Sequence, residues 1–212
     1  MEFFDDALQR YLDHHTDPET EVLARLNRET NLKVMYPRML SGHYSGRFLA
    51  MIAKLLQPNK IVEVGTYTGY SALCLAEGLP EGGELHTIDV NPETMDYARR
   101  YVEAAGKSAM IHLHEGDALE ILPQLQGAVE LAFLDAKKEQ YKQYYELLLP
   151  KMPAGGVILT DNVLWSGKVV DKSFTDKTTE ALREYNDYVA QDERVEKIML
   201  PIRDGIYLAR KR

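Results

Sequence analysis

The sequence predicts an α/β protein with a mostly parallel, seven-stranded sheet, helices on both faces and a helical N-terminal extension. Short apolar runs alternate with helical patterns between residues 60 and 161, which is typical of a parallel sheet. Two strand-like runs follow, 195–202 and 205–211, separated only by Arg203 and Asp204. Such a short connection forces antiparallel pairing, and Asp-Gly is a hairpin signal. A plain dinucleotide-binding domain would instead end on a sixth parallel strand.

The elements follow from periodicity, and we expect one domain, 1–212, with a helical extension over 1–42 and a catalytic core over 43–212. The extension has apolar residues at helical spacing from Phe3 to Leu12, then a helix with Asp17 as N-cap and Pro18 in its first turn. Strands are expected at 60–65, 84–90, 109–116, 129–135 and 155–161, and helices at 45–56, 70–79, 92–105, 118–126, 140–149 and 178–190.

Composition excludes several classes of protein. The chain has 212 residues, of which 33 are acidic and 25 basic, giving a formal net charge of −8 that argues mildly against non-specific nucleic-acid binding. No apolar stretch approaches the roughly 18–20 residues that a membrane span needs. The single cysteine, Cys74, permits no intrachain disulfide and no cysteine-based zinc site. We therefore expect a cytoplasmic protein without a membrane partner.

The run VEVGTYTGY, residues 62–70, is the strongest local motif. A buried strand ends at Gly65, and a helix starts near Gly69, so the backbone can approach a ligand closely and present helix N–H groups. The pyrophosphate fingerprint G-x-G-x-x-G is absent, because Tyr67 occupies the place of its second glycine. Glu63 would repel a pyrophosphate but could accept a hydrogen bond from a cationic ligand. A generic strand–helix turn is the alternative interpretation.

Acidic residues follow the next two strands. Asp89 lies some 20 residues beyond the glycine turn, where such residues typically bind ribose hydroxyls. It could instead cap the helix that begins at Pro92, although Asn91 already suits that role. Asp117, in Gly116-Asp117-Ala118, could equally touch an adenine or cap a helix.

Oxygen-bearing side chains end two further strands. Asp135 follows the fourth strand, and Asp161 and Asn162 follow the fifth. In an open parallel sheet these carboxyl ends gather functional groups. Two carboxylates and an amide oxygen suit a hard cation such as magnesium, calcium or manganese. Without a cation the two carboxylates would repel each other.

Seven motifs together carry a resemblance to a known family. The chain resembles the cation-dependent O-methyltransferases, the group that includes the caffeoyl-CoA O-methyltransferases and is similar in its core to catechol O-methyltransferase. The resemblance implies a class I methyltransferase fold, Rossmann-like, with the last strand antiparallel. It runs from Met39 to the C-terminus through MLSGHYSGRFL, VEVGTYTGYSA, TIDVNPE, GDALEILP, FLDAKKEQY, TDNVLWSGKV and LPIRDGIYLARK.

The resemblance also implies cofactors and site residues. Asp135, Asp161 and Asn162 match the metal ligands, for magnesium, calcium or manganese. Lys138 matches a lysine near the reacting hydroxyl, with Asp135 beside it. Plant members usually read Asp-Ala-Asp-Lys, and Lys137 replaces the second aspartate here, which puts plant-like substrate recognition in doubt. S-adenosylmethionine would be held by Met39, Ser41, Glu63, Gly65, Tyr70, Ser71, Asp89, Asp117, Ala118 and Asp135.

The predicted reaction is methyl transfer from S-adenosylmethionine to a small molecule with vicinal hydroxyls, catechol-like or hydroxycinnamoyl. Such a transfer is an in-line displacement, so a cation chelated by two vicinal oxygens would orient the acceptor and lower its pKa. Lys138 could then take the proton. Trp165 could be a wall for a flat acceptor or could simply pack in the core.

Other interpretations stay open. A tRNA hydroxyuridine O-methyltransferase is the main alternative, because TDNVL is similar to the motif of bacterial relatives. It would need a basic patch, for which the candidates are Lys137, Lys138, Lys142, Lys168, Lys172 and residues 210–212. A nicotinamide oxidoreductase is disfavoured by Tyr67, and a non-catalytic binding module by the metal triad. Relatives are commonly homodimers, and Phe3, Phe4 and Leu8 could supply an apolar contact.

Three further features have structural interpretations. His112 and His114 share one face of a strand, and with no third ligand in view we expect a structural role for them. Cys74 suits a small buried position. Tyr141, Tyr144 and Tyr145 fit the packed face of a helix.

Overall fold

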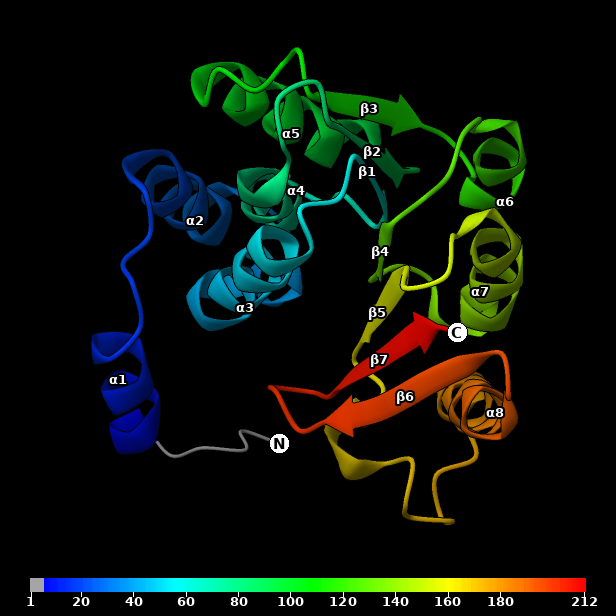
Figure 1. Ribbon diagram of the computed structural model, residues 1–212. Coiled ribbons are helices and arrows are strands. Elements are labelled where there is room, and N and C mark those ends of the chain that lie inside the picture. Colours follow the sequence, from blue (N-terminus) through cyan, green and yellow to red (C-terminus); the bar gives the residue numbers. More distant parts are fainter. Residues whose placement is uncertain (1–5) are drawn as a thin grey trace. The chain divides into compact units, whose positions relative to one another are not determined.

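The computed structural model describes residues 6–212, which form the seven strands that the sequence predicts (Figure 1). The strand order is β3-β2-β1-β4-β5-β7-β6. Strands β1, β2 and β3 run parallel, as do β4 and β5, whereas β7 runs antiparallel to both β5 and β6. The predicted fold class is therefore confirmed. The described chain divides after Asp117 into two compact parts, which we call the N-terminal unit (6–117) and the C-terminal unit (118–212).

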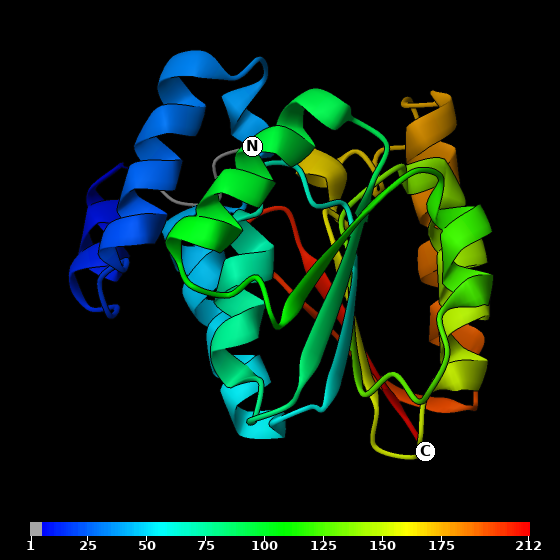
Figure 2. The ribbon, with the colours of Figure 1, turned by 90° about the horizontal axis from the view of Figure 1, so that it is seen from above.

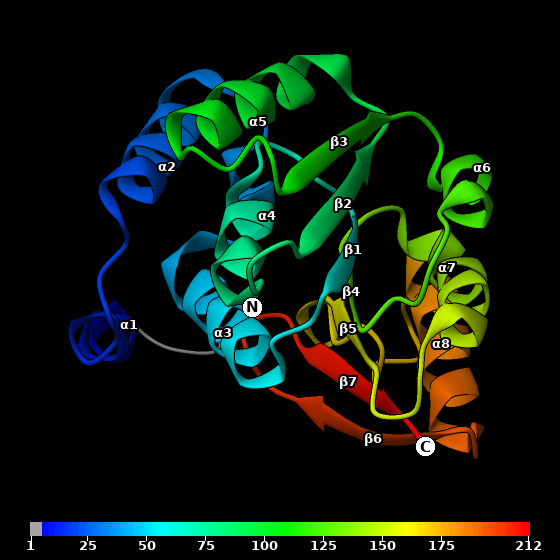
Figure 3. The same ribbon diagram turned by 45° about the horizontal axis from the view of Figure 1, so that its top comes forward.

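The N-terminal unit combines three parallel strands with helices on one face of them, as Figures 2 and 3 show. The first of these strands is buried except at its first residue, the second is about half buried, and the third is buried only at Ile111; a glycine adjoins each strand at one end. The elements are α1 (Asp6–His14), α2 (Glu21–Lys33), η1 (Pro37–Met39), α3 (Gly42–Leu56), β1 (Lys60–Val64), α4 (Tyr70–Leu75), η2 (Ala76–Gly78), β2 (Glu84–Asp89), α5 (Pro92–Ala104) and β3 (Ile111–Glu115).

Two predicted helix starts in this unit are wrong. Asp17 does not cap α2, because the Thr20 side chain accepts a hydrogen bond from the Leu23 N–H at 3.3 Å and the helix begins only after it. Helix α3 begins at Gly42, three residues before the expected Ser45. Phe3 and Phe4, which were expected in the first helix, lie outside the described residues.

The C-terminal unit places α6, α7 and α8 on one face of its four strands (Figure 2). Tyr141 and Tyr145 of α7 are fully buried and contact Tyr185 of α8 edge-on, which confirms the predicted packing role of the tyrosines. The elements are α6 (Ala118–Ile121), η3 (Leu122–Gln124), β4 (Leu131–Leu134), η4 (Lys138–Gln140), α7 (Tyr141–Leu148), η5 (Leu149–Lys151), β5 (Val157–Asp161), η6 (Trp165–Gly167), α8 (Lys177–Gln191), β6 (Val195–Leu200) and β7 (Ile206–Lys211).

The hairpin between β6 and β7 is antiparallel as predicted, but its connection is longer than Arg203-Asp204. Pairing stops at Leu200↔Ile206 because Pro201 has no N–H to continue the ladder. The reversal is closed by a hydrogen bond from the Gly205 N–H to the Ile202 carbonyl at 2.9 Å. Among the described residues, no helix is long and apolar enough to cross a membrane.

Candidate active site

The glycine turn after β1 is held in shape by main-chain hydrogen bonds. Gly65 and Gly69 have φ values of 106° and 90°, a region that favours glycine. The Gly65 N–H donates to the Ile88 carbonyl at 2.9 Å, which ties the turn to the end of β2. A Cβ on Gly69 would lie 3.1 Å from the Ala98 Cα, so glycine here also permits close packing on α5. The turn is thus a rigid element that leads directly into α4.

Two acidic residues flank this turn in different environments. Glu63 is fully buried and accepts a hydrogen bond from Thr87 Oγ1, which is also bonded to Thr66 Oγ1. Asp89 is half-buried, and its carboxylate accepts from the main-chain N–H groups of Tyr67, at 2.8 Å, and Asn91, at 3.0 Å. Asn91 itself accepts from the Glu93 N–H as the cap of α5, so Asp89 is not that cap. Each Asp89 oxygen keeps a lone pair for a further donor.

The other predicted cofactor residues of the N-terminal unit differ in exposure. Met39 is exposed in η1, whereas Ser41 and Ser71 are buried. Tyr70 is buried, and its hydroxyl donates to Glu19 Oε1 at 2.6 Å, so its side chain is already engaged with the segment before α2. Asp117 is exposed at the end of this unit, and Ala118 is buried in the first turn of α6.

In the C-terminal unit, the proposed oxygen ligands end two paired strands. Leu134 of β4 pairs with Thr160 of β5, so Asp135, directly after β4, lies beside Asp161, the last residue of β5. Asp161 is almost completely buried, whereas Asp135 is half-buried. Asn162 follows in the left-handed region at φ 60°, and its N–H donates to Asp161 Oδ1 at 2.8 Å. The structure therefore brings together the three residues that the sequence singled out.

The charged form of Asp161 is destabilised in the folded protein. Burial first, and the neighbouring Asp135 carboxylate second, raise the pKa of Asp161 from 3.8 to about 7. Arg203 and Lys138 oppose this shift without cancelling it. A divalent cation between the carboxylates would remove the repulsion, and the donor set of two carboxylates and an amide oxygen suits such a cation.

Lys138 lies beside these carboxylates. Its Nζ is 2.7 Å from Asp135 Oδ1 and 5.2 Å from the centre of the Tyr141 ring, and its side chain is only 12% exposed. The Tyr141 hydroxyl donates to the Asp161 carbonyl at 3.1 Å, so the ring that supports Lys138 is fixed to the end of β5. The lysine is therefore held in place rather than solvated.

Trp165 lies on a loop that the β6–β7 turn anchors. The Leu164 N–H donates to the Asp204 carbonyl at 2.9 Å, and the Ser166 N–H donates to the Asp204 carboxylate. Trp165 itself is half-buried, with φ 48°. The loop after Asn162 thus has a fixed course, and the indole lies three residues beyond the oxygen ligands.

Comparison with known proteins agrees with this geometry. The profile of the O-methyltransferase family matches residues 13–212. The chain belongs to this family. It is 36% identical to caffeoyl-CoA O-methyltransferase 1 of Zea mays over 219 residues, which cover 98% of this chain and 85% of the relative.

Solved structures of O-methyltransferases show the same fold. The Bacillus cereus O-methyltransferase in complex with SAH superposes with a TM-score of 0.91 and is 26% identical, covering 97% of each chain. TomG of Streptomyces achromogenes, in complex with SAM, gives a TM-score of 0.89 at 28% identity and covers 97% of this chain and 96% of its own. The predicted family, fold and class of enzyme are thereby confirmed.

Sequence reasoning missed one cluster in this O-methyltransferase family member. His112 and His114 were expected to lack a third ligand, but β2 brings Glu84 and His86 beside them. The alternation in Glu84-Leu85-His86 was a signal for this face, yet only the register of β2 against β3 shows that the two strands' polar side chains meet.

Proposed function

We propose that this chain transfers the methyl group of S-adenosylmethionine to one hydroxyl of a small molecule with vicinal hydroxyls, aided by a divalent cation at Asp135, Asp161 and Asn162. One observation carries the proposal: the paired ends of β4 and β5 place two carboxylates together in a largely buried position. Lys138 pairs with Asp135, yet burial and the Asp135 charge still raise the pKa of Asp161, and a divalent cation would compensate both carboxylates. Membership of the O-methyltransferase family supports the reaction class.

The glycine turn supports the choice of methyl donor. Asp89 is fixed by two main-chain donors and can accept further hydrogen bonds, as a ribose diol requires. Glu63 puts a carboxylate at the end of β1, where a dinucleotide pyrophosphate would be repelled. Tyr67 has φ 48°, and its hydroxyl donates to the Met35 and Tyr36 carbonyls, so its side chain occupies space that the dinucleotide fingerprint leaves to a glycine. TomG, which shares this fold, was solved with SAM.

The chain's own residues would then perform the proton transfer. When bound, the cofactor supplies an electrophilic methyl group, and the cation lowers the pKa of the acceptor hydroxyl. As the methyl group passes from sulfur to the acceptor oxygen, the role of Lys138 Nζ would be to accept the proton that the acceptor hydroxyl loses. Asp135 and the Tyr141 ring position this amine. Trp165 would provide an apolar wall for a flat acceptor.

A tRNA acceptor receives no support from these observations. Several basic residues proposed for its patch are engaged by acidic partners: Lys142 pairs with Glu184, and Arg210 and Arg212 both pair with Glu196. Lys211 donates to main-chain carbonyls at 3.0 and 2.7 Å. Neutralised or inward-directed cations contribute little to binding a phosphate backbone.

Methyl transfer from labelled S-adenosylmethionine tests the proposal. Catechol, a hydroxycinnamoyl thioester and bulk tRNA are offered as acceptors, with magnesium, manganese or excess chelator. We expect transfer to a vicinal diol only with a cation, and loss of transfer in Asp161→Asn with retained cofactor binding in calorimetry. Asp187→Asn, an exposed change on α8, is the matched control and should remain active.

Three outcomes would contradict parts of the proposal. Full activity in chelator, or in Asp161→Asn, would show that the carboxylates are structural. Transfer to tRNA alone would replace the acceptor class. Binding of NAD without binding of S-adenosylmethionine or its demethylated product would overturn the assignment of the cofactor.

A further inference from the structure

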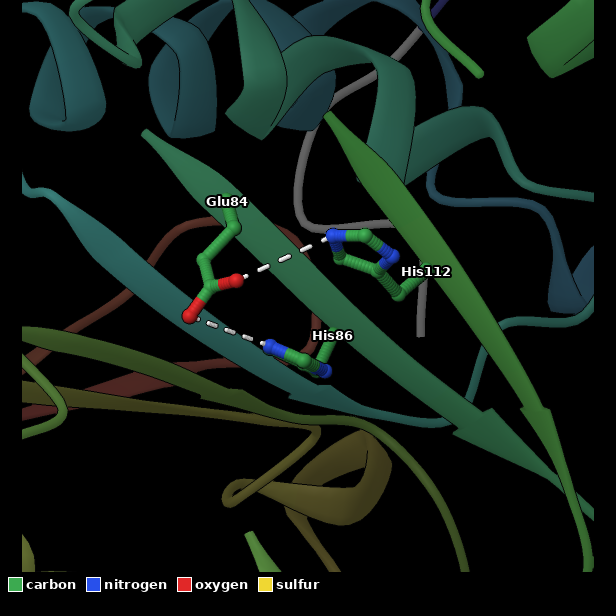
Figure 4. A group of neighbouring side chains, drawn as sticks. All are labelled: Glu84, His86 and His112. Carbon is green, nitrogen blue, oxygen red and sulfur yellow. Dashed lines mark ion pairs between the residues drawn. The ribbon is translucent and has the colours of Figure 1, made fainter. Parts of the chain in front are cut away.

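A second polar cluster lies in the N-terminal unit, on strands β2 and β3. Glu84 and His86 are two residues apart on β2 and therefore share a face, and His112 on β3 is paired directly with His86 (Figure 4). We propose that these three side chains form a binding site for zinc or a similar transition-metal cation, separate from the oxygen ligands of the C-terminal unit.

The ligand atoms are already close to the spacing that such a cation requires. The separation is 3.4 Å between His86 Nε2 and Glu84 Oε1, and 3.8 Å between His112 Nε2 and Glu84 Oε2. Zinc–ligand bonds of about 2.0–2.1 Å in a tetrahedral site imply ligands about 3.4 Å apart. One ligand atom from each residue can be chosen so that all three lie within 4.8 Å of one another. The His86 and His112 rings stack with their centres 4.9 Å apart, so binding would require the side chains to rotate until the nitrogens converge on the ion.

A fourth residue sets the orientation of His86. His86 Nδ1 and His114 Nε2 are hydrogen-bonded at 2.9 Å, and the two rings stack with their centres 5.1 Å apart. If His86 Nδ1 donates this bond, its Nε2 carries a lone pair directed toward the Glu84 carboxylate. Among the described residues His86 Nε2 is buried and has no hydrogen-bond partner. Metal-binding histidines commonly donate their other N–H in this way.

The chemistry of the cluster selects the cation. Two imidazoles and one carboxylate suit zinc, copper, nickel or cobalt, whereas magnesium and calcium prefer oxygen ligands alone. His112 is 42% exposed and Glu84 36%, which leaves an approach for the ion from solvent.

Lys60 is the competitor for this site. Its Nζ lies 2.6 Å from Glu84 Oε1, because Lys60 of β1 is paired with Glu84 of β2. When a metal cation binds Glu84, the Lys60 ammonium must either move away from the carboxylate or stay beside the metal as a second positive charge. Removing it should therefore strengthen metal binding, which a purely structural ion-pair network would not explain.

Zinc titration of the metal-free chain against a chromogenic zinc chelator tests the site. We expect one tightly bound zinc in the wild type. His112→Ala and Glu84→Gln should weaken it at least about 10-fold, and His114→Ala by about 10- to 100-fold, the usual range for an orienting partner. Lys60→Ala should bind up to about fivefold more tightly, as expected for removal of an ion pair near the surface. Cobalt bound in place of zinc should give the visible spectrum of a tetrahedral site.

Two variants control for other zinc ligands. His15→Ala removes an exposed histidine directly after α1 and should bind zinc as the wild type does, as should Asp161→Asn. Circular dichroism of each variant tests whether it folds, and because His112 is half-exposed, its truncation should cost little stability. The proposal would be overturned if the wild type bound no zinc. It would also be overturned if both His112→Ala and Glu84→Gln kept wild-type affinity, or if zinc binding were lost only in His15→Ala or only in Asp161→Asn. None of these readouts depends on methyl transfer.

Discussion

Replacing Asp161 with asparagine should stabilise the metal-free protein at alkaline pH. The pKa of Asp161 is raised from 3.8 to about 7 by burial and by Asp135. One pKa unit corresponds to about 1.4 kcal/mol, so ionisation of this carboxyl costs the folded state up to about 4 kcal/mol. Asparagine cannot ionise, but its amide oxygen can still accept the hydrogen bond from the Asn162 N–H.

The sign of the effect fixes its pH window. Because the folded pKa lies above the unfolded one, the folded chain binds more protons between about pH 4 and pH 7, and the wild type loses stability as pH rises through this range. The variant is not destabilised in this way, because asparagine does not ionise. Its advantage should be absent near pH 4 and complete above pH 7, at about 2–4 kcal/mol. For a chain of this length that is roughly 5–15 °C in melting temperature.

Calorimetric melting in chelator at pH 4 and pH 8 measures the difference, with Asp187→Asn as the exposed control. Excess magnesium or manganese at pH 8 should then raise the melting temperature of the wild type and leave that of Asp161→Asn unchanged. A variant that melts below the wild type at pH 8 in chelator would refute the argument, because Asp161 would then be stabilising in its charged form.

Three further predictions concern single features. Lys138→Met should lower kcat about 100- to 10,000-fold while calorimetry shows unchanged cofactor binding, and unaltered turnover would exclude this amine as the base. Gly205→Ala should lower the free energy of unfolding in urea by more than the control Gly82→Ala does. Both glycines have positive φ, but only a Cβ on Gly205 would collide with a neighbour, Leu164 Cγ. Equal losses in the two variants would show that backbone strain, and not this collision, accounts for the effect. Light scattering should find a homodimer, with the 42%-exposed Leu8 of α1 as a candidate contact, and a monomeric mass at micromolar concentration would contradict this.

The parallel part of the sheet could be predicted from the sequence because β1, β4 and β5 are short apolar runs that the fold buries, and helical patterns separate them. The carboxyl ends of parallel strands lie at one edge of a sheet, so the topology alone predicts that Asp135 and Asp161 are neighbours. The residue that caps α2 could not be predicted, because two nearby residues suit that position. Asp17 and Thr20 are both good N-caps, and the choice between them depends on where the chain turns to pack α2, which periodicity does not reveal.

The contacts between side chains of β2 and β3 could not be predicted from the sequence, because they depend on strand register. His86 and His112 are 26 residues apart, and only the register Leu85↔Ile111, His86↔His112 puts them on one face. A shift of one residue would turn His112 to the opposite face, and the cluster with Glu84 would not exist. The raised pKa of Asp161 likewise depends on burial by neighbours that no motif specifies.

The position of β7 affects how the C-terminal unit can be assembled during synthesis. Strand β7 is made after β6 but lies between β5 and β6. As the chain emerges from a ribosome, β5 therefore keeps one bare edge, and β6 has no template, until Ile206–Lys211 arrive. Bare strand edges are sites of aggregation, so the unit is exposed to edge-to-edge association until β7 is inserted. The same insertion brings Gly205 and Asp204 to the loop after Asn162, so the main-chain hydrogen bonds that fix this loop require the β6–β7 turn to be in place.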